Sequence, residues 1–163
     1  TAQLVMGDAL AVALLDLKEF TDNDFAKYHP GGALGKRLYL RVKDLYVLNE
    51  KPMVHTDDKI KEVIVEISEK RLGATAVLDK ENNLAGIITD GDLRRMLEKM
   101  NHFDEVKASD IMSTNPKVVA PDEYAINAFE MMRKNNITSL IVAENGNYHG
   151  IVHIHDMLKE GFV

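Results

Sequence analysis

An internal repeat constrains the fold of this 163-residue chain more than any single motif does. Residues 43–45 (KDL) correspond to residues 109–111 (SDI), and residues 54–58 (VHTDD) correspond to residues 119–123 (VAPDE). The two copies therefore lie about 65 positions apart. Because a unit of this size cannot cover both faces of a sheet by itself, we expect the copies to pack together about a pseudo-twofold axis.

Both copies carry the same order of predicted elements after a short lead-in strand. An apolar stripe at helical spacing comes first, and two β-type runs joined by a polar turn follow it. The runs are residues 75–78 and 86–89 in the first copy, and 140–143 and 150–153 in the second. An aspartate then opens a second helix, so the pattern predicts an α/β (α+β) fold. The stripes consist of Ile60, Val63, Ile64 and Ile67, and of Ala125, Ala128, Phe129 and Met132.

The first 17 residues differ from the rest of the chain. Between Leu4 and Leu15 the only charged residue is Asp8, and apolar residues occupy nearly every side of the predicted helix. A helix that is apolar all round must be buried all round, and the polar residues 18–36 cannot cover it. We interpret it as the last helix of a larger domain; packing on its own domain or in a dimer is the alternative. The Pro- and Gly-rich residues 29–37 predict a loop or linker.

Composition excludes several classes of protein. The chain has no cysteine, which removes disulfides, thiolate metal sites and a cysteine nucleophile, and makes the cytoplasm the expected location. A net charge of −6 disfavours nucleic acid as a partner, because phosphates require a basic face. The longest apolar run, residues 9–15, is far shorter than the ~20 residues that cross a bilayer, so we expect no membrane partner.

Residues 86–92 (GIITDGD) consist of a glycine, two apolar residues, a threonine, two variable residues and an aspartate. This pattern resembles the strand-to-helix motif of the CBS domain, and the two copies together resemble a CBS pair. The second copy, residues 150–156 (GIVHIHD), keeps the glycine and the aspartate but has His153 where threonine is expected. The resemblance implies a tandem CBS-domain pair of two β-α-β-β-α repeats, with CBS domain 1 over residues 41–104 and CBS domain 2 over residues 105–163.

The N-terminal segments narrow this resemblance. Residues 4–15 (LVMGDALAVALL), then residues 29–35 (HPGGALG), then a CBS pair are similar to the second half of the KpsF/GutQ-type D-arabinose 5-phosphate isomerases. Those proteins have a sugar isomerase (SIS) domain before two CBS domains. The resemblance implies that residues 1–40 are the terminal helix and linker of an SIS domain, which would be a partner in the same chain. It also implies a homodimer through the CBS pairs within a tetrameric parent.

The same resemblance implies a reaction for the parent protein, the interconversion of D-ribulose 5-phosphate and D-arabinose 5-phosphate on the route to Kdo, a sugar of lipopolysaccharide or capsule. Such an isomerisation needs a base, an acid at the oxygens and a phosphate site. His29, in the segment that resembles the family's HPGGALG motif, is the candidate catalytic residue, acting only with the SIS domain. A linker histidine held by hydrogen bonds is the alternative. The other catalytic groups belong to the SIS domain, so we expect the fragment alone to be inactive.

The CBS resemblance also implies a ligand site. In CBS domains the threonine or serine and the aspartate of the motif meet a ribose-phosphate, which places Thr89 and Asp92 in one cleft and His153 and Asp156 in the pseudo-symmetric one. Capping of the helices by these aspartates without any ligand is the alternative. The apolar residues Val54 and Val119 are expected to flank a base. The remaining expected lining residues start the strands: Ala74, Thr75, Thr138 and Ser139.

A metal site is not expected. His149, His153 and His155 with Asp156 are zinc-ligand types, and His153 and His155 share a strand face. However, His149 lies beyond a glycine, and the correspondence with Thr89 already accounts for position 153. The resemblance implies a regulatory module that needs no cofactor and senses a nucleotide or nucleotide-sugar: pathway logic favours CMP-Kdo first, then AMP, ADP or ATP. The alternative is a ligand-free structural module that sets the oligomeric state.

Overall fold

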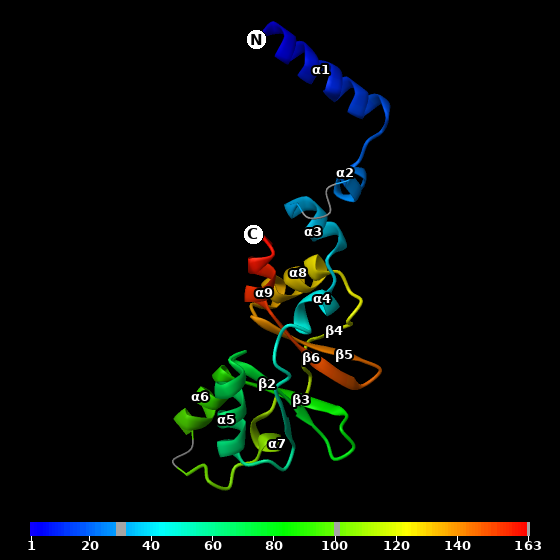
Figure 1. Cartoon of the computed structure of the whole chain (residues 1–163). Helices are drawn as coiled ribbons and strands as arrows, with labels where there is room; N and C mark the ends of the chain where they lie inside the picture. Colours follow the sequence, from blue (N-terminus) through cyan, green and yellow to red (C-terminus); the bar gives the residue numbers. More distant parts are fainter. Residues whose placement is uncertain (29–31, 100–101, 163) are drawn as a thin grey trace. The chain divides into compact units, whose positions relative to one another are not determined.

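The computed structural model describes residues 1–28, 32–99 and 102–162 (Figure 1). The chain divides into two units, Thr1–Tyr39 and Leu40–Val163. The first unit holds α1 (Ala2–Leu17), α2 (Asp22–Tyr28) and α3 (Ala33–Tyr39). The predicted N-terminal helix is confirmed, and none of its residues is buried. His29 lies outside the described residues.

The prediction of a loop over residues 29–37 is wrong for its second part, because α3 begins at Ala33. Residues 33–39 (ALGKRLY) are mostly good helix formers, and the helical cost of Gly35 is only about 1 kcal/mol. The segment before it is also helical. There Thr21 and Asp24 form a capping box at the start of α2: the Thr21 amide donates to Asp24 Oδ2 (3.0 Å), and the Asp24 amide donates to Thr21 Oγ1 (3.3 Å).

The second unit contains the two predicted β-α-β-β-α repeats. A short helix precedes each repeat, α4 (Val42–Tyr46) and α7 (Ala108–Ile111). The first repeat consists of β1 (Met53–His55), α5 (Ile60–Lys70), β2 (Ala74–Leu78), β3 (Leu84–Thr89) and α6 (Asp90–Lys99). The second consists of β4 (Val118–Val119), α8 (Ala125–Asn135), β5 (Ser139–Glu144), β6 (Asn147–His153) and α9 (Ile154–Lys159).

Each repeat forms its own three-stranded sheet, in the orders β1-β2-β3 and β4-β5-β6. The lead-in strand pairs in parallel with the first strand of an antiparallel hairpin, so both predicted hairpins are confirmed. Equivalent pairs define the correspondence of the repeats: Ala74 is opposite Thr89, and Ser139 is opposite His153. Positions 89 and 153 therefore stand at the same place, where a strand passes into the second helix.

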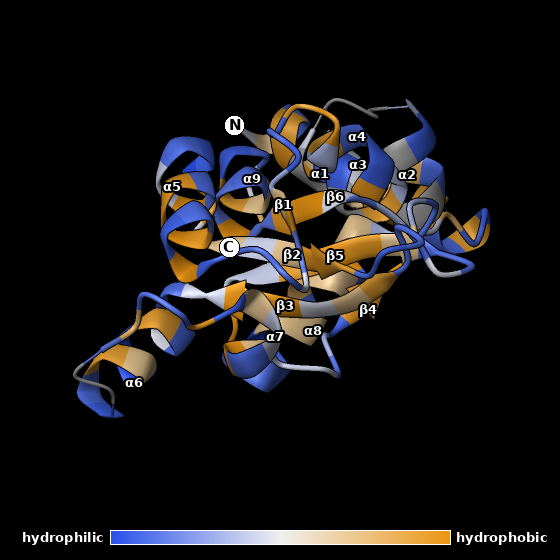
Figure 2. Ribbon diagram, turned by 90° about the horizontal axis from the view of Figure 1, so that it is seen from below, coloured by the Kyte–Doolittle hydropathy of each residue, from blue (hydrophilic) through white to orange (hydrophobic). Residues whose placement is uncertain are grey.

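The two sheets share an apolar cluster. Ala74, Ala76 and Leu78 are alternate residues of β2, so their side chains lie on the same face of the strand. They pack with Ile141 of β5 and Ile151 of β6. The small alanines allow the sheets to approach closely. In Figure 2 the strands of both sheets are mostly hydrophobic, whereas α5 has separate hydrophobic and hydrophilic faces. The predicted packing of the copies against each other is thus present in the second unit.

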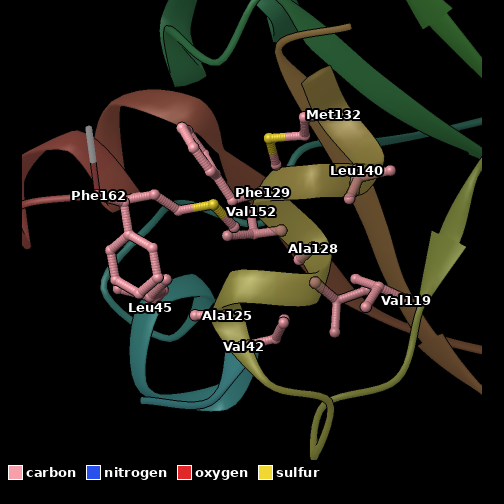
Figure 3. Close-up of a cluster of buried hydrophobic side chains, with 12 residues drawn as sticks. Val42, Leu45, Val119, Ala125, Ala128, Phe129, Met132, Leu140, Val152 and Phe162 are labelled. Atoms are coloured by element: carbon pink, nitrogen blue, oxygen red, sulfur yellow. The ribbon is translucent and has the colours of Figure 1, made fainter. Parts of the chain in front are cut away.

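Each helical core is completed by the lead-in helix of the other repeat. Val42 and Leu45 of α4 pack against Ala125 and Phe129 of α8 (Figure 3), and Ala108 of α7 packs in the cluster of α5. Backbone hydrogen bonds hold the segment before each repeat against the other repeat. The Val42 amide donates to the Glu123 carbonyl (2.9 Å), and the Ile60 amide donates to the Val106 carbonyl (3.0 Å). The boundary between residues 104 and 105 therefore divides the sequence but not the packing.

No helix in the described part of the chain combines the length and the apolar character needed to cross a membrane.

Candidate ligand-binding site

A cleft of about 520 Å³ lies between the two repeats. Its walls are the start of α6, the segment before β4 and the turn that leads from α8 into β5. Because both repeats contribute a wall, the cleft exists only when they are packed together. The lining residues are Leu72, Gly73, Ile87, Thr89, Asp90, Gly91, Asp92, Arg95, Ser113, Asn115, Pro116, Lys117, Asn136, Ile137, Thr138, Ser139 and His153.

Thr89 and Asp92 are joined by a dense set of hydrogen bonds at the start of α6. Asp92 Oδ2 accepts from the Thr89 amide (2.8 Å) and from Thr89 Oγ1 (2.7 Å), while the Asp92 amide donates to Thr89 Oγ1 (3.3 Å). This is a capping box, so Asp92 does cap the helix. The side chain is nearly buried, with the residue 9% exposed. The cap leaves Asp92 Oδ1 directed to a third group.

That third group is the guanidinium of Arg95, one turn further along α6. Its Nη2 donates to Asp92 Oδ1 at 2.6 Å, and its side chain is 62% exposed. Water screens the exposed guanidinium, whereas the carboxylate of Asp92 is nearly buried. Arg95 can therefore turn to an anion in the cleft, provided that another donor replaces it at Asp92 Oδ1.

Lys117, from the second repeat, supplies a further cation. It is exposed, and among the described residues no carboxylate pairs with its Nζ. Cations on two walls, the start of a ten-residue helix and a nearly buried carboxylate can bind phosphate and hydroxyl groups together. The hydroxyls of Thr138 and Ser139 add neutral donors on the remaining wall.

His153 lines this same cleft. Its Nδ1 accepts a hydrogen bond from the His155 amide (3.1 Å), which places the proton of the neutral ring on Nε2. Burial, followed by the nearby His155, lowers the pKa of His153 below its ordinary value. The side chain is therefore a neutral hydrogen-bond donor at pH 7 and not the imidazolium that would pair with a phosphate.

Asp156, the counterpart of Asp92, has different partners. Its Oδ2 accepts from the His153 amide (3.0 Å), so it also caps its helix. The second donor to Oδ2 is Asn49 Nδ2, at 2.6 Å, and the same amide group donates to the Ile151 carbonyl (3.2 Å). Asp156 does not line the cleft.

The cleft therefore brings together five of the residues expected from the sequence: Thr89, Asp92, Thr138, Ser139 and His153. The expectation that His153 and Asp156 line a separate cleft is not met, because His153 lines the same cleft as Thr89 and Asp156 lines none of it. Four other expected residues are buried and do not line this cleft. Val54 and Val119 are each 4% exposed within the helical cores, and Ala74 and Thr75 are buried inside β2. The two residues before β2, Leu72 and Gly73, reach the cleft in their place.

Sequence reasoning missed Arg95, Lys117, Asn115 and Asn136. Arg95 lies one turn after a motif aspartate, where its side chain must return to that carboxylate. Asn115 and Asn49 hold the same place in the repeat, and this shared asparagine is the signal that could have identified the segment before β4. No group of three or more histidine, aspartate or glutamate side chains within the described ranges could hold a metal ion.

A second hollow of about 520 Å³ runs along α1. It is one side of a single exposed helix, and Gln3 is the only polar side chain among the residues that line it. It lacks the convergent polar groups that orient a small molecule, so it is not a ligand site.

Comparison with known proteins follows the same division of the chain. The model of the CBS domain matches residues 42–99 and 108–162. The arabinose 5-phosphate isomerase KdsD of Francisella tularensis is 49% identical over 161 residues, which cover 98% of this chain and 49% of that protein. The KdsD of Yersinia pestis is 44% identical over 164 residues, covering 100% of this chain and 50% of its own length. The chain thus spans about half the length of these curated relatives.

Among solved structures, the CBS domain protein of Pyrobaculum aerophilum complexed with AMP superposes with a TM-score of 0.65 at 23% identity. The alignment covers 76% of this chain and 100% of that protein. Two matched CBS segments, which together make up more than half of the sequence, and the paired sheets with exchanged lead-in helices agree: the chain belongs to the CBS domain family.

Proposed function

We propose that this chain is the regulatory CBS pair of an arabinose 5-phosphate isomerase and binds a nucleotide or nucleotide-sugar between its repeats. The relatives that carry this enzyme name are about twice as long as the chain, which supports a further catalytic domain in the same protein. The exposed apolar side chains of α1 support burial of that helix against such a domain. His29 would act only there, and the present chain alone would have no isomerase activity.

One observation carries the ligand proposal: Asp92 at the start of α6 lies in the same cleft as the cations Arg95 and Lys117. A phosphate can displace Arg95 from Asp92 and bind between the two cations, near the positive end of the α6 dipole. The freed Asp92 Oδ1 then accepts from ribose hydroxyls. The neutral His153 and the hydroxyls of Thr138 and Ser139 remain as donors to the base or sugar.

The size of the cleft suits such a ligand. Pockets for small molecules commonly measure ~300–1,000 Å³, and this one is about 520 Å³. The Pyrobaculum aerophilum protein of the same fold binds AMP. We propose CMP-Kdo as the first ligand to test, because an end product of the pathway would regulate its early step, and AMP, ADP and ATP as the next.

The test is the thermal unfolding of the chain with each of these four nucleotides. A ligand that binds only the folded state at a hundredfold excess over its Kd stabilises it by about 2.7 kcal/mol, which raises the Tm by several degrees. We expect Asp92→Ala to abolish this increase. The control is Asp104→Ala, which removes an exposed aspartate that pairs with Lys61 and does not line the cleft. No increase with any of the four at millimolar concentration would refute the proposal.

A structural module that sets the oligomeric state without a ligand is the second candidate. Exposed apolar side chains in the second unit favour it, including Leu48 at 79%, Val47 at 61% and Leu97 at 52%. Sedimentation of the wild type and of Asp92→Ala separates the two candidates. The same oligomeric mass in both proteins, together with the absence of any response to the nucleotides, would support the structural module.

A further inference from the structure

The repeat provides two equivalent aspartates, and their side chains accept from different donors. Asp92 Oδ2 accepts from the hydroxyl of its own cap residue, Thr89. At the equivalent place His153 has no hydroxyl, and its Nδ1 is an acceptor for the His155 amide. Asp156 Oδ2 therefore lacks a local side-chain donor, and Asn49 Nδ2 supplies one at 2.6 Å. The histidine at position 153 thus removes the hydroxyl donor to the motif aspartate, and Asn49 supplies the donor in its place.

The backbone before each lead-in strand explains how Asn49 gets there. After α7 the chain turns extended at once, with ψ of 148° at Met112. After α4 it stays helical, with ψ of −17° at Val47. The amides of Leu48 and Asn49 then donate to the carbonyls of Leu45 and Tyr46, which continues the helical turn by three residues. This extra turn carries Asn49 inward to the edge of β6.

The backbone carbonyls at the strand edges also have different donors in the two repeats. In the first repeat the Ile87 carbonyl accepts from the Ser113 amide (2.9 Å), a backbone bond between two extended segments. In the second repeat the equivalent carbonyl, that of Ile151, accepts from Asn49 Nδ2 at 3.2 Å. One side-chain amide thus takes over a backbone hydrogen bond and a hydroxyl hydrogen bond. Its counterpart Asn115 lines the open cleft and makes no side-chain hydrogen bond to the described residues.

We propose that Asn49 closes the second CBS site: its amide ties the segment before β1 to Asp156 and to the Ile151 carbonyl, so each chain binds one nucleotide, in the cleft of Asp92. This inference rests on the proposed nucleotide-binding function and adds its stoichiometry. The Oδ1 atoms do not distinguish the two aspartates, because each faces an exposed cation, Arg95 for Asp92 and Lys159 (3.8 Å) for Asp156. The contrast lies in the segment before the lead-in strand: Asn115 lines the open cleft, whereas Asn49 is bonded to the Asp156 carboxylate. The Asn49 amide is partly buried and holds two acceptors at once.

The experiment is a titration of the whole chain with CMP-Kdo and, separately, with AMP by isothermal calorimetry. We expect one site in the wild type. Removal of the Asn49 amide should open the second site, so that Asn49→Ala binds two ligands and Asn49→Ala with Asp92→Ala binds one. Asn49→Asp is the second variant: it keeps the size of the side chain but cannot donate to Asp156. Asn49→Asp should also bind two ligands, and it serves as the test if Asn49→Ala is too unstable to titrate.

The matched control is Asn127→Ala, which removes an exposed asparagine whose Nδ2 donates to Glu123 Oε1 (2.7 Å). It should keep one site. Two sites in the wild type, or one site in both Asn49 variants, would overturn the inference and leave nucleotide binding intact. No binding of either ligand to the wild type and to the variants would overturn the proposed function, and the inference with it.

Discussion

The two repeats share one backbone plan and differ at the start of their second helices. In the first repeat the carboxylate of Asp92 faces a polar cleft, with a screened arginine as its outermost partner. In the second the carboxylate of Asp156 is held by an asparagine from a segment 107 positions away. Both aspartates still cap their helices through the same backbone bond. The cap is therefore present in both sites. What distinguishes them is the second donor to Oδ2, which is the Thr89 hydroxyl for Asp92 and the Asn49 amide for Asp156.

This difference teaches how a duplicated unit can specialise without changing its fold. The cap bond stabilises each helix by about 1 kcal/mol whether or not a ligand is bound, so the aspartate is retained in both copies. Three equivalent positions then differ between the sites: Thr89 against His153, Arg95 against Lys159, and Asn115 in the cleft against Asn49 bonded to Asp156. None of them belongs to a core cluster.

The largest expected effect tests the exchange of lead-in helices. Leu45 is buried in the core of the second repeat, whereas its counterpart Ile111 is only partly buried in the core of the first. We expect Leu45→Ala to lower the free energy of unfolding by about 3 kcal/mol and Ile111→Ala by about half as much. Urea denaturation measures both. Leu48→Ala, the same substitution at an exposed leucine, is the control and should change stability by less than about 0.5 kcal/mol.

Hydrogen exchange locates the damage. With Leu45→Ala we expect faster amide exchange in α8 of the second repeat, although the substitution lies before the first repeat in sequence. Faster exchange confined to α5 would show that α4 belongs to the first core, and it would contradict the exchanged packing.

The two motif glycines give the next largest effect. A Cβ on Gly86 would lie 2.7 Å from the Ser113 carbonyl oxygen, which is backbone fixed by two hydrogen bonds to Ile87. A Cβ on Gly150 would lie 2.9 Å from the Tyr46 ring, a partly buried side chain that can turn. We expect Gly86→Ala to cost about 2 kcal/mol and Gly150→Ala about 1 kcal/mol, measured by urea denaturation. Equal costs would mean that the two lead-in segments are equally rigid.

Much of this fold could be predicted from sequence because its signals are local. The stripe with Ile60 and Val63 and the alternation in the hairpins depend on spacings of a few residues, and the repeat doubled each signal. The packing of Val42 against Ala125 could not be predicted, because a contact across so many positions leaves no periodic pattern. The helix α3 was missed since Gly35 was given more weight than the helix formers around it.

The candidate site divides in the same way. Thr89 and Asp92 were identified as cleft residues because the motif sets them at the start of a helix. Lys117 was missed because a single lysine has no pattern, and its role depends on a segment of the other repeat. Val54 and Val119 were misplaced because a short apolar strand does not show which of its faces meets a core. Asn49 was missed because a helical turn and an extended segment are indistinguishable over three residues.

A smaller effect separates the two equivalent asparagines. Asn49→Ala leaves the Ile151 carbonyl and Asp156 Oδ2 short of a donor in a partly buried place, and we expect a loss of about 1.5 kcal/mol. Asn115→Ala should change stability by less than about 0.5 kcal/mol, because the exposed Asn115 satisfies no buried group. Chemical denaturation without any ligand measures both. Equal losses of stability would mean that Asn49 does not hold the site of Asp156 more firmly than Asn115 holds the cleft of Asp92.

The smallest effect is the pH dependence that we expect from His153 in the second repeat. Burial and His155 lower the folded-state pKa of His153 below its ordinary value of 6.5, and Lys159 lowers it further, while Asp156 opposes them. Between the folded and the unfolded pKa the unfolded chain binds more protons, so stability falls as the pH drops below about 6.5. Protonation of Nδ1 also removes the acceptor for the His155 amide.

We expect His153→Asn to reduce this decline, and thermal unfolding from pH 7.5 to pH 5 measures it. His153→Thr restores the residue type of the first repeat and should reduce the decline as well, since its hydroxyl can donate to Asp156 without titrating. His102→Asn, at an exposed position after α6, is the matched control. If the decline is as steep in His153→Asn as in the wild type, carboxylates cause it and the second site has no proton-sensitive cap. If the decline is reduced only in the His153 variants, the residue that departs from the CBS motif makes the stability of the second repeat depend on pH. Thr89, at the equivalent position of the first repeat, does not titrate and cannot have this effect.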